Sequence, residues 1–384
     1  MRKLVLTFAI ALAITAASAR GADESADSKA PTTQPARKQL KNLGETPKQP
    51  RFPLTERVWP AKPGEAHVCL WADDKYAAFS FTVDDNMSQD HAWWRQTADK
   101  YGFKVTWFVI TGRVGTSGPW GTWEGWKKLQ AAGHDVQSHT VTHLHAEEPG
   151  WKGVEWEYTD AIKHVEQNVP DHKVLTLAYP GGKNSKLNSR ELAAKLYIAA
   201  RGTQGIPNAA NQTDYFNINA TGGLHVGGPK APWADIRNMF RPVARNYVRF
   251  RRGWYVLLCH GVKDDAKPGV LKICDYLHEH KDDVWIGLFT EVAQYGQERD
   301  TAKLTVTASS DSKTALTLTD EMDDKLFDFP LTVKVRLPEA WTAVAAVQGD
   351  KPVEAKIVEH EGGKFALVKA VPDRGAVTLT PVAQ

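Results

Sequence analysis

The chain has 384 residues, of which 42% are hydrophobic and 24% charged, and its formal net charge is +3. This length favours one large domain with a smaller one, and the composition is typical of a globular protein. The small net charge gives no reason to expect a nucleic-acid partner. The chain has only three cysteines, Cys69, Cys259 and Cys274, which excludes a fold held together by several disulfides.

The N-terminal segment has the pattern of a signal peptide. Two basic residues precede an apolar stretch, Leu4–Ala16, and small residues follow it. The stretch is short for a membrane span, and no later segment has about 18 uninterrupted apolar residues. We therefore predict a signal peptide over residues 1–22, cleaved after Ala19 or Ala22, and an exported protein, periplasmic or extracellular, without a membrane span.

Residues 23–50 are rich in Pro, Ser, Thr and Lys and have almost no apolar periodicity. Such a composition cannot bury enough apolar surface to fold. We predict a disordered leader over residues 23–50 and a folded domain that begins at residue 51.

Strand-like and helix-like segments alternate from residue 51 to residue 299. The expected strands are residues 77–83, 104–110, 134–139, 174–180, 254–260 and 283–290, and the expected helices are residues 90–102, 122–133, 156–168, 188–196, 234–250 and 268–280. This alternation indicates parallel strands joined by right-handed crossovers. The number of units predicts a distorted (β/α) barrel of the α/β class, with a flat doubly wound sheet as the alternative.

The pattern changes over residues 300–384, where short alternating runs are separated by Gly, Pro and Asp. We predict a small C-terminal β-sandwich-like module. Its acidic segment, residues 319–330, lacks the regular ligand spacing of a calcium loop, so we expect a solvated loop there.

Two adjacent carboxylates, Asp84 and Asp85, follow the expected strand 77–83. Neighbouring ionised acids repel each other, and burial beside a core strand makes the repulsion stronger. A solvated turn is the ordinary explanation of such a pair. The alternative is a bound cation, because catalytic groups of a (β/α) barrel lie at the C-terminal ends of its strands.

Two histidines, His139 and His143, stand at the end of another expected strand with i, i+4 spacing. On a helical turn this spacing points both imidazoles the same way, which suits two ligands of one metal ion. One carboxylate and two imidazoles leave a coordination position open for water. The aspartate that does not bind the metal would then accept a proton from that water, and His260, at the end of the expected strand 254–260, would protonate the leaving group.

The segments FTVDD, HTVTH, AYPGG and LLCHG occur in this order. They resemble the motifs of the polysaccharide deacetylase family, the NodB-like fold of carbohydrate esterase family 4, over residues 75–299. The resemblance implies a distorted (β/α) barrel and a catalytic domain over residues 51–299. The roles that it implies are general base for Asp84, metal ligands for Asp85, His139 and His143, and general acid for His260.

The third motif departs from the family pattern R-x-P-[FY]. Ala178 stands at the arginine position and Gly181 at the aromatic position. A backbone N–H can serve an oxyanion whatever the side chain, so Gly181, together with Tyr179, is assigned to the oxyanion and substrate. The arginine that orients the catalytic aspartate in the family is missing, and Arg201 is the candidate substitute.

Two other motif positions are less regular. The glycine that commonly follows the aspartate pair is Asn86 in this chain. The fourth motif, an aspartate and a tryptophan that tune the acid histidine, has only weak candidates in Trp233 and Asp235.

The resemblance implies an exported, metal-dependent hydrolase that acts on carbon–nitrogen bonds other than peptide bonds. Zn²⁺ is the default ion, since two imidazoles and one carboxylate suit it, and Co²⁺ or Ni²⁺ would also fit. The expected substrate is an acetylated glycan, with N-acetylglucosamine units preferred. The alternatives are an O-acetyl esterase acting on xylan and a non-catalytic glycan-binding protein; the second is disfavoured because binding alone needs neither Asp84 nor His260.

Overall fold

The computed structural model describes residues 49–145, 148–184, 189–220, 222–224 and 250–382. The predicted signal peptide, nearly all of the predicted leader and the predicted helix 234–250, and the residues Trp233 and Asp235 lie outside this part of the chain. In the part described, no helix is long and apolar enough to cross a membrane.

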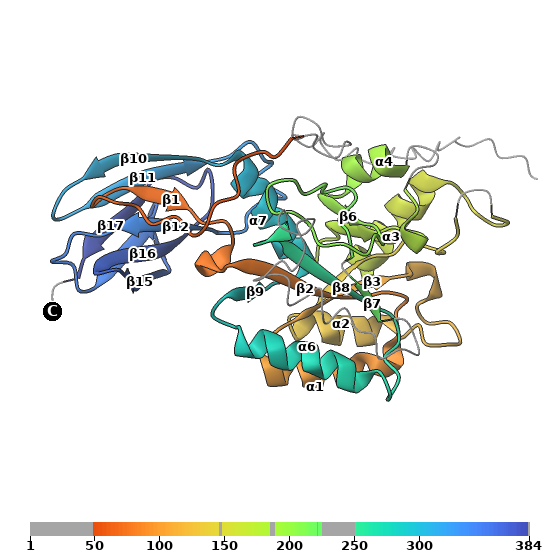
Figure 1. The fold of residues 1–384 in the computed structure, drawn as a ribbon. Coiled ribbons are helices and arrows are strands. Elements are labelled where there is room, and N and C mark those ends of the chain that lie inside the picture. Colours follow the sequence, from red (N-terminus) through yellow and green to blue (C-terminus); the bar gives the residue numbers. More distant parts are fainter. Residues whose placement is uncertain (1–48, 146–147, 185–188, 221, 225–249, 383–384) are drawn as a thin grey trace, which may run out of the picture. The chain divides into compact units, whose positions relative to one another are not determined.

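The larger domain is built on one parallel sheet that curls into an incomplete barrel (Figure 1). The strand order is β6-β5-β4-β3-β2-β8-β7, and β9 also pairs with β2. The strands are β2 (Ala77–Val83), β3 (Val105–Val109), β4 (Asp135–Ser138), β5 (Thr176–Ala178), β6 (Ala199–Arg201), β7 (Gly222–Leu224), β8 (Trp254–Cys259) and β9 (Val284–Ile286). The predicted distorted (β/α) barrel is confirmed, and the flat doubly wound alternative is wrong.

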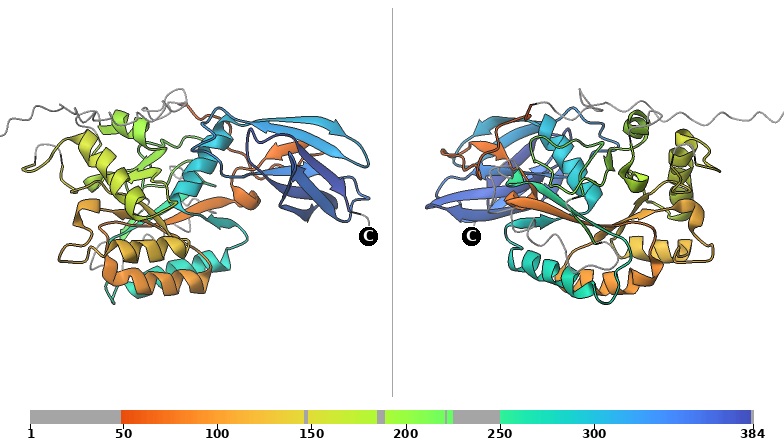
Figure 2. Two further views of the ribbon diagram at one scale, coloured as in Figure 1. Left: turned by 180° about the vertical axis from the view of Figure 1, so that it is seen from behind. Right: turned by 45° about the vertical axis from the view of Figure 1, so that its right-hand side comes forward.

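Helices cover the outside of this sheet, with α1, α2 and α6 along one flank and α3 and α4 along another (Figures 1 and 2). They are α1 (His91–Tyr101), α2 (Trp123–Ala131), α3 (Val154–Asn168), α4 (Ser189–Leu196), α6 (Lys267–Glu279) and α7 (Phe289–Thr301), with 3₁₀ turns at Ala72–Asp74, Ser88–Asp90, Thr111–Arg113 and Pro180–Gly182. Local signals set their ends. Thr122 accepts a hydrogen bond from the Gly125 N–H at the start of α2, and Gly102 ends α1 with a φ of +75°.

The central strand β2 ends directly before the aspartate pair, Asp84 and Asp85. All seven of its residues are buried, and its Phe81 ring stacks on Phe103 with ring centroids 4.3 Å apart. Burying such a ring contributes about 1.5–3 kcal/mol to stability. At the end of the strand the Asp84 N–H donates to the Cys259 carbonyl of β8 (2.8 Å), so the strand pairing continues up to the first aspartate.

The prediction of one strand over residues 283–290 is wrong in its second half, where α7 begins at Phe289. This helix is not amphipathic, since polar residues such as Gln294, Gln297 and Glu298 are buried together with the apolar ones. The sequence before α7 therefore shows a strand-like apolar run, whereas the sequence of α7 lacks the apolar periodicity that predicts a helix.

The C-terminal module consists of two antiparallel sheets, with strand orders β1-β12-β16-β15 and β10-β11-β17-β13-β14, which agrees with the predicted β-sandwich-like module. Its strands are β10 (Lys303–Ser309), β11 (Thr314–Thr319), β12 (Leu331–Arg336), β13 (Val344–Gln348), β14 (Lys351–Val353), β15 (Ala355–His360), β16 (Gly363–Ala370) and β17 (Val377–Pro381). The sequence pattern does not predict β1 (Ala66–Val68), which precedes the barrel in the chain yet pairs with β12.

A buried lysine connects the module to the barrel. Lys334 of β12 is fully buried, and its Nζ pairs with the carboxylate of Asp74 just before β2. The same Nζ donates to the Val58 carbonyl (2.8 Å) and lies 3.5 Å from the ring centroid of Trp59. Asp74 is 8% exposed, so the two charges depend on each other for compensation.

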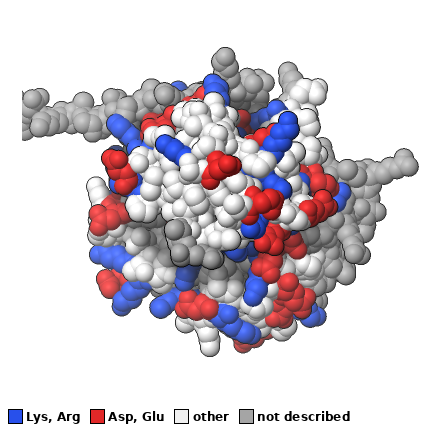
Figure 3. Space-filling view, turned by 90° about the vertical axis from the view of Figure 1, so that its left-hand side faces the viewer, with Lys and Arg blue, Asp and Glu red and all other residues white. Residues whose placement is uncertain are grey.

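The surface charges agree with the small net charge. On the face shown in Figure 3, Lys and Arg side chains alternate with Asp and Glu side chains, without a large area of one sign among the coloured residues. The three cysteines are buried and free, so the chain carries no disulfide.

Candidate metal centre

A sharp turn after β2 presents the second aspartate. Asp85, Asn86 and Met87 all have positive φ values, of 59°, 62° and 38°. Asparagine tolerates this left-handed region better than most residues, which explains Asn86 in place of a glycine. The Asn86 side chain also fixes the turn, since its Oδ1 accepts from the Ile110 N–H (2.9 Å) and its Nδ2 donates to the Trp120 carbonyl (3.0 Å).

The two histidines meet through a bend and not through a helical turn, which corrects the predicted local geometry. His139 follows β4 directly, and the residues after it form a loop in which Thr140 and His143 have φ values of +66° and +64°. Thr140 Oγ1 accepts a hydrogen bond from the His143 N–H (3.1 Å). This bend brings the two imidazole centroids to 4.7 Å from each other.

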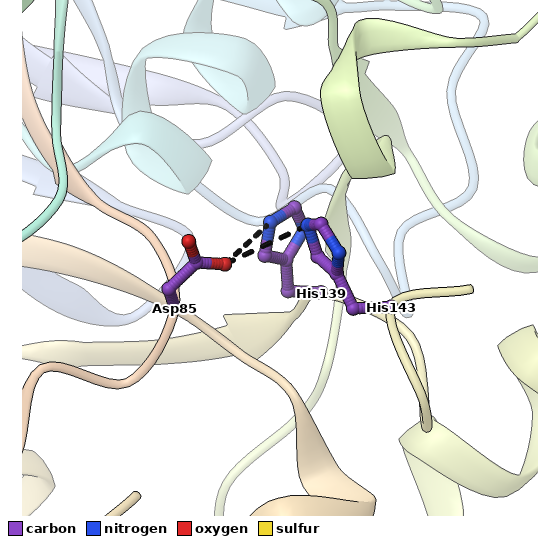
Figure 4. A group of neighbouring side chains, drawn as sticks. All are labelled: Asp85, His139 and His143. Atoms are coloured by element: carbon purple, nitrogen blue, oxygen red, sulfur yellow. Dashed lines mark ion pairs between the residues drawn. The ribbon is translucent and has the colours of Figure 1, made fainter. Parts of the chain in front are cut away.

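One carboxylate oxygen faces both imidazoles (Figure 4). Asp85 Oδ1 lies 3.5 Å from His139 Nε2 and 3.6 Å from His143 Nε2. The three candidate ligand atoms lie within 4.8 Å of one another, and Asp85 Oδ1 is buried without a hydrogen bond from any residue that the structure describes. A buried carboxylate oxygen between two imidazole nitrogens fits a divalent cation of the zinc type.

His139 has the protonation state that a metal ligand needs. Its Nδ1–H donates to the Ala178 carbonyl (2.8 Å), so Nε2 keeps its lone pair and faces the aspartates. Burial lowers the pKa of His139 to about 4, so the ring is neutral near pH 7. A hydrogen bond from the far nitrogen to a backbone carbonyl is the usual support of a metal-binding histidine.

Arg201 contacts the first aspartate. Its guanidinium is fully buried at the end of β6 and donates from Nη2 to both carboxylate oxygens of Asp84. In the β5–β6 pairing Arg201 lies opposite Ala178, which stands at the arginine position of the third motif. Burial alone would raise the pKa of Asp84, but the charge of Arg201 lowers it below its usual value, so Asp84 is ionised.

His260 approaches the other carboxylate oxygen of Asp85. Its Nε2 lies 3.6 Å from Asp85 Oδ2, and its side chain is about one quarter exposed. The following loop is fixed by Asp90, whose Oδ2 accepts from the Val262 N–H (2.8 Å). The five residues Asp84, Asp85, His139, His143 and His260 therefore come together at the C-terminal ends of β2, β4 and β8.

Of the two third-motif residues assigned to the oxyanion and substrate, Gly181 agrees with that assignment better than Tyr179. Gly181 has a φ of +57°, and a Cβ on it would lie only 3.1 Å from His145 Cε1, so both backbone and space favour glycine. Tyr179 does not lie where a substrate contact was expected. Its ring is buried, its hydroxyl donates to the Phe216 carbonyl (3.1 Å) and its N–H donates to the Arg201 carbonyl (3.0 Å).

A cavity of about 200 Å³ lies between the loop after His143 and the turn that contains Pro180. Its wall combines apolar and polar side chains, as is usual for small-molecule pockets. The lining residues include His145, Trp151, Pro180 and Lys183.

Sequence reasoning misses Glu157, a glutamate of α3 that is 2% exposed. Its carboxylate accepts hydrogen bonds from the loop that joins the two candidate histidine ligands. In the sequence it is one of several acids in a helix of alternating polarity, and such acids are usually exposed. No local signal separates it from Glu155, which is exposed on the same helix.

Comparisons with known proteins find similarity to deacetylases over part of the chain. Residues 73–200 match the family model "Polysaccharide deacetylase". A protein named gellan lyase, from Bacillus sp., is 37% identical over 346 residues, which cover 84% of this chain and 14% of that protein. Among solved structures, a Streptococcus pyogenes deacetylase in complex with acetate is 27% identical, with 36% of this chain and 62% of that chain covered and a TM-score of 0.33. A putative polysaccharide deacetylase from Mycobacterium smegmatis is 17% identical, with 66% and 99% covered and a TM-score of 0.42.

Proposed function

We propose that this chain, whose residues 73–200 match the polysaccharide deacetylase family model, is an exported, divalent-metal-dependent hydrolase that removes acetyl groups from a glycan. N-acetyl groups of N-acetylglucosamine units are the first candidate. The observation that carries the proposal is the position of Asp85 Oδ1 between the Nε2 atoms of His139 and His143, beside an Asp84 that Arg201 pairs with.

Asp85, His139 and His143 would hold the cation, with Zn²⁺ as the default and Co²⁺ or Ni²⁺ as alternatives. A bound divalent cation supplies Lewis acidity, which activates water and polarises the acetyl carbonyl. Asp84 is the general base that accepts a proton from the attacking water. Its ionised form is the one that the reaction needs, and the ion pair with Arg201 supports that form.

His260 is the general acid that protonates the leaving nitrogen. Its place beside Asp85 Oδ2, away from the oxygen that faces the two other histidines, supports this separate role. The Gly181 N–H donates to the acetyl oxygen as negative charge develops on it. Within the described part of the chain no acceptor takes this N–H, whereas that of Tyr179 donates to Arg201.

The test is acetate release by the full chain loaded with Zn²⁺ or Co²⁺ and by the metal-free chain. The substrates are chitin oligomers, peptidoglycan, acetylated xylan and, because of the relative named gellan lyase, acetylated gellan. We expect metal-dependent release from the N-acetylated substrates. Asp84→Asn should keep the metal and lose activity by about 10²–10⁴-fold, the usual contribution of a general base.

The same assay separates the alternatives. Acetate release only from acetylated xylan or gellan would indicate that the site acts as an O-acetyl esterase and not as an N-deacetylase. Metal binding and glycan binding without acetate release from any substrate would indicate a non-catalytic glycan-binding protein. An Asp84→Asn variant that is as active as the wild type would overturn the assignment of the base.

A further inference from the structure

The segment between the two candidate metal ligands is held on both sides by hydrogen bonds. It consists of residues 140–142, which we call the histidine loop. His139 precedes the loop and His143 follows it. A shift of the loop therefore changes the distance between the Nε2 atoms of the two histidines.

One side of the histidine loop rests on α3. Glu157 Oε2 accepts from the N–H groups of Val141 and Thr142, both at 2.9 Å, and Glu157 Oε1 accepts from the Thr142 hydroxyl. Three donors therefore converge on two oxygens of one carboxylate. A carboxylate is the side-chain group that accepts at both oxygens and donates at neither.

The other side rests on the 3₁₀ turn after β3. The Thr111 N–H donates to the Thr140 carbonyl (3.0 Å), and the Gly112 N–H donates to the Val141 carbonyl (2.8 Å). A Cβ on Gly112 would lie 2.7 Å from the Val141 oxygen, closer than real contacts allow. The N–H groups of Val141 and Thr142 thus face Glu157, and the carbonyls of Thr140 and Val141 face the turn at Thr111 and Gly112.

From this arrangement we infer that Glu157 is a positioning residue of the metal centre, and that it sets metal affinity by fixing the histidine loop. Thr140 in the loop and His143 just after it both have left-handed backbone, which is unfavourable for these residue types without outside support. Residues that orient metal ligands from outside the coordination shell typically change metal affinity by about 10–100-fold when they are replaced. The inference depends on the proposed metal site.

The experiment compares metal affinity with fold stability in three variants of the full chain. Glu157→Gln keeps the shape but gives up one acceptor oxygen, Glu157→Ala removes both, and Glu155→Gln is the control on the exposed side of α3. Affinity is measured by Co²⁺ titration, with the visible absorption of the bound ion as the signal, and by Zn²⁺ calorimetry. Stability is measured by urea unfolding of the metal-free proteins.

We expect Co²⁺ affinity to fall about 10-fold in Glu157→Gln and about 100-fold in Glu157→Ala, with a changed Co²⁺ spectrum, while Glu155→Gln binds as the wild type does. Gly112→Ala, which disturbs the opposite side, should also weaken Co²⁺ binding. If both Glu157 variants lose stability but bind Co²⁺ as the wild type does, Glu157 is merely structural and the inference is wrong. A wild-type chain that binds no metal would overturn the proposed function itself.

Discussion

Arg201 and Asp84 form a buried ion pair in which one guanidinium nitrogen reaches both carboxylate oxygens. The arginine comes from β6, the strand next to the one that carries the third motif, and the register places it opposite Ala178. A planar guanidinium holds a carboxylate in a fixed orientation, which an ammonium group does less well. The function of the missing motif arginine can therefore be supplied from the neighbouring strand.

Arg201→Met should shift the acid limb of the pH–rate profile to higher pH. Without the arginine, burial dominates at Asp84 and raises the pKa of the carboxyl, so the base is protonated over a wider range. The measurement is kcat/KM for acetate release between pH 4 and 9. Arg251→Met is the control, since Arg251 lies in an exposed pair with Glu56. An unshifted acid limb in Arg201→Met would separate Arg201 from the ionisation of Asp84.

His143→Ala and His145→Ala form a matched pair for the ligand assignment. His143 Nε2 faces Asp85 Oδ1, whereas His145 lies beside Gly181 with its ring centroid 6.0 Å from that of His143. We expect His143→Ala to lose bound zinc after dialysis and His145→Ala to keep it, as measured by elemental analysis. Equal loss of zinc in both variants would contradict the ligand set.

His134 should make the metal-free protein less stable as the pH falls. Burial, and then the charge of Lys104, lowers the pKa of His134 to about 4 in the folded state, against about 6.5 in the unfolded chain. Between pH 6.5 and 4 the unfolded state therefore binds more protons, and the free energy of unfolding decreases as the pH decreases, by up to about 1.4 kcal/mol per pH unit from this group.

His134→Gln should reduce that slope, because glutamine does not titrate. Urea unfolding at pH 4.5, 5.5, 6.5 and 7.5 in the presence of a chelator gives the slope, and His278→Gln, at an exposed position of α6, is the control. The prediction fails if the slopes of wild type and His134→Gln coincide.

Lys334→Met should destabilise the chain by about 3–5 kcal/mol, because it leaves the carboxylate of Asp74 buried without its charge partner. Lys356→Met, on an exposed position of β15, should change stability by less than about 0.5 kcal/mol. Urea midpoints of the two variants provide the comparison. A similar small effect of both substitutions would show that the Asp74 carboxylate does not depend on Lys334.

Local sequence signals predict only part of this architecture. The buried run Ala77–Val83 is predicted to the residue, because every position of the central strand is apolar or small. The three-residue strands β1 and β6 and the non-amphipathic helix α7 have no comparable pattern, since partners far along the chain determine them. Tertiary context overrides local preference at such positions.

Only some features of the candidate site can likewise be predicted from the sequence. The aspartate pair and the H-x-x-x-H spacing are visible in the sequence, and the structure brings these residues together. The bend at Thr140, the support from Glu157 and the burial of Tyr179 depend on which elements pack against each other. The sequence suggests Arg201 only because the motif arginine is absent. The register of β5 and β6, which places Arg201 opposite Ala178, explains how Arg201 reaches Asp84.

The pairing of β1 with β12 has a consequence for how the chain reaches its native state. Ala66 of β1 lies opposite Val335 of β12. During synthesis β1 therefore cannot pair until the whole barrel and half of the module have been made. Closing so long a loop costs more entropy than any local pairing, and such contacts form late in folding. We expect the barrel to reach its native state before the edge strand docks, and a fragment of residues 300–384 to have an uncovered edge at β12 that a peptide containing Ala66–Val68 could fill.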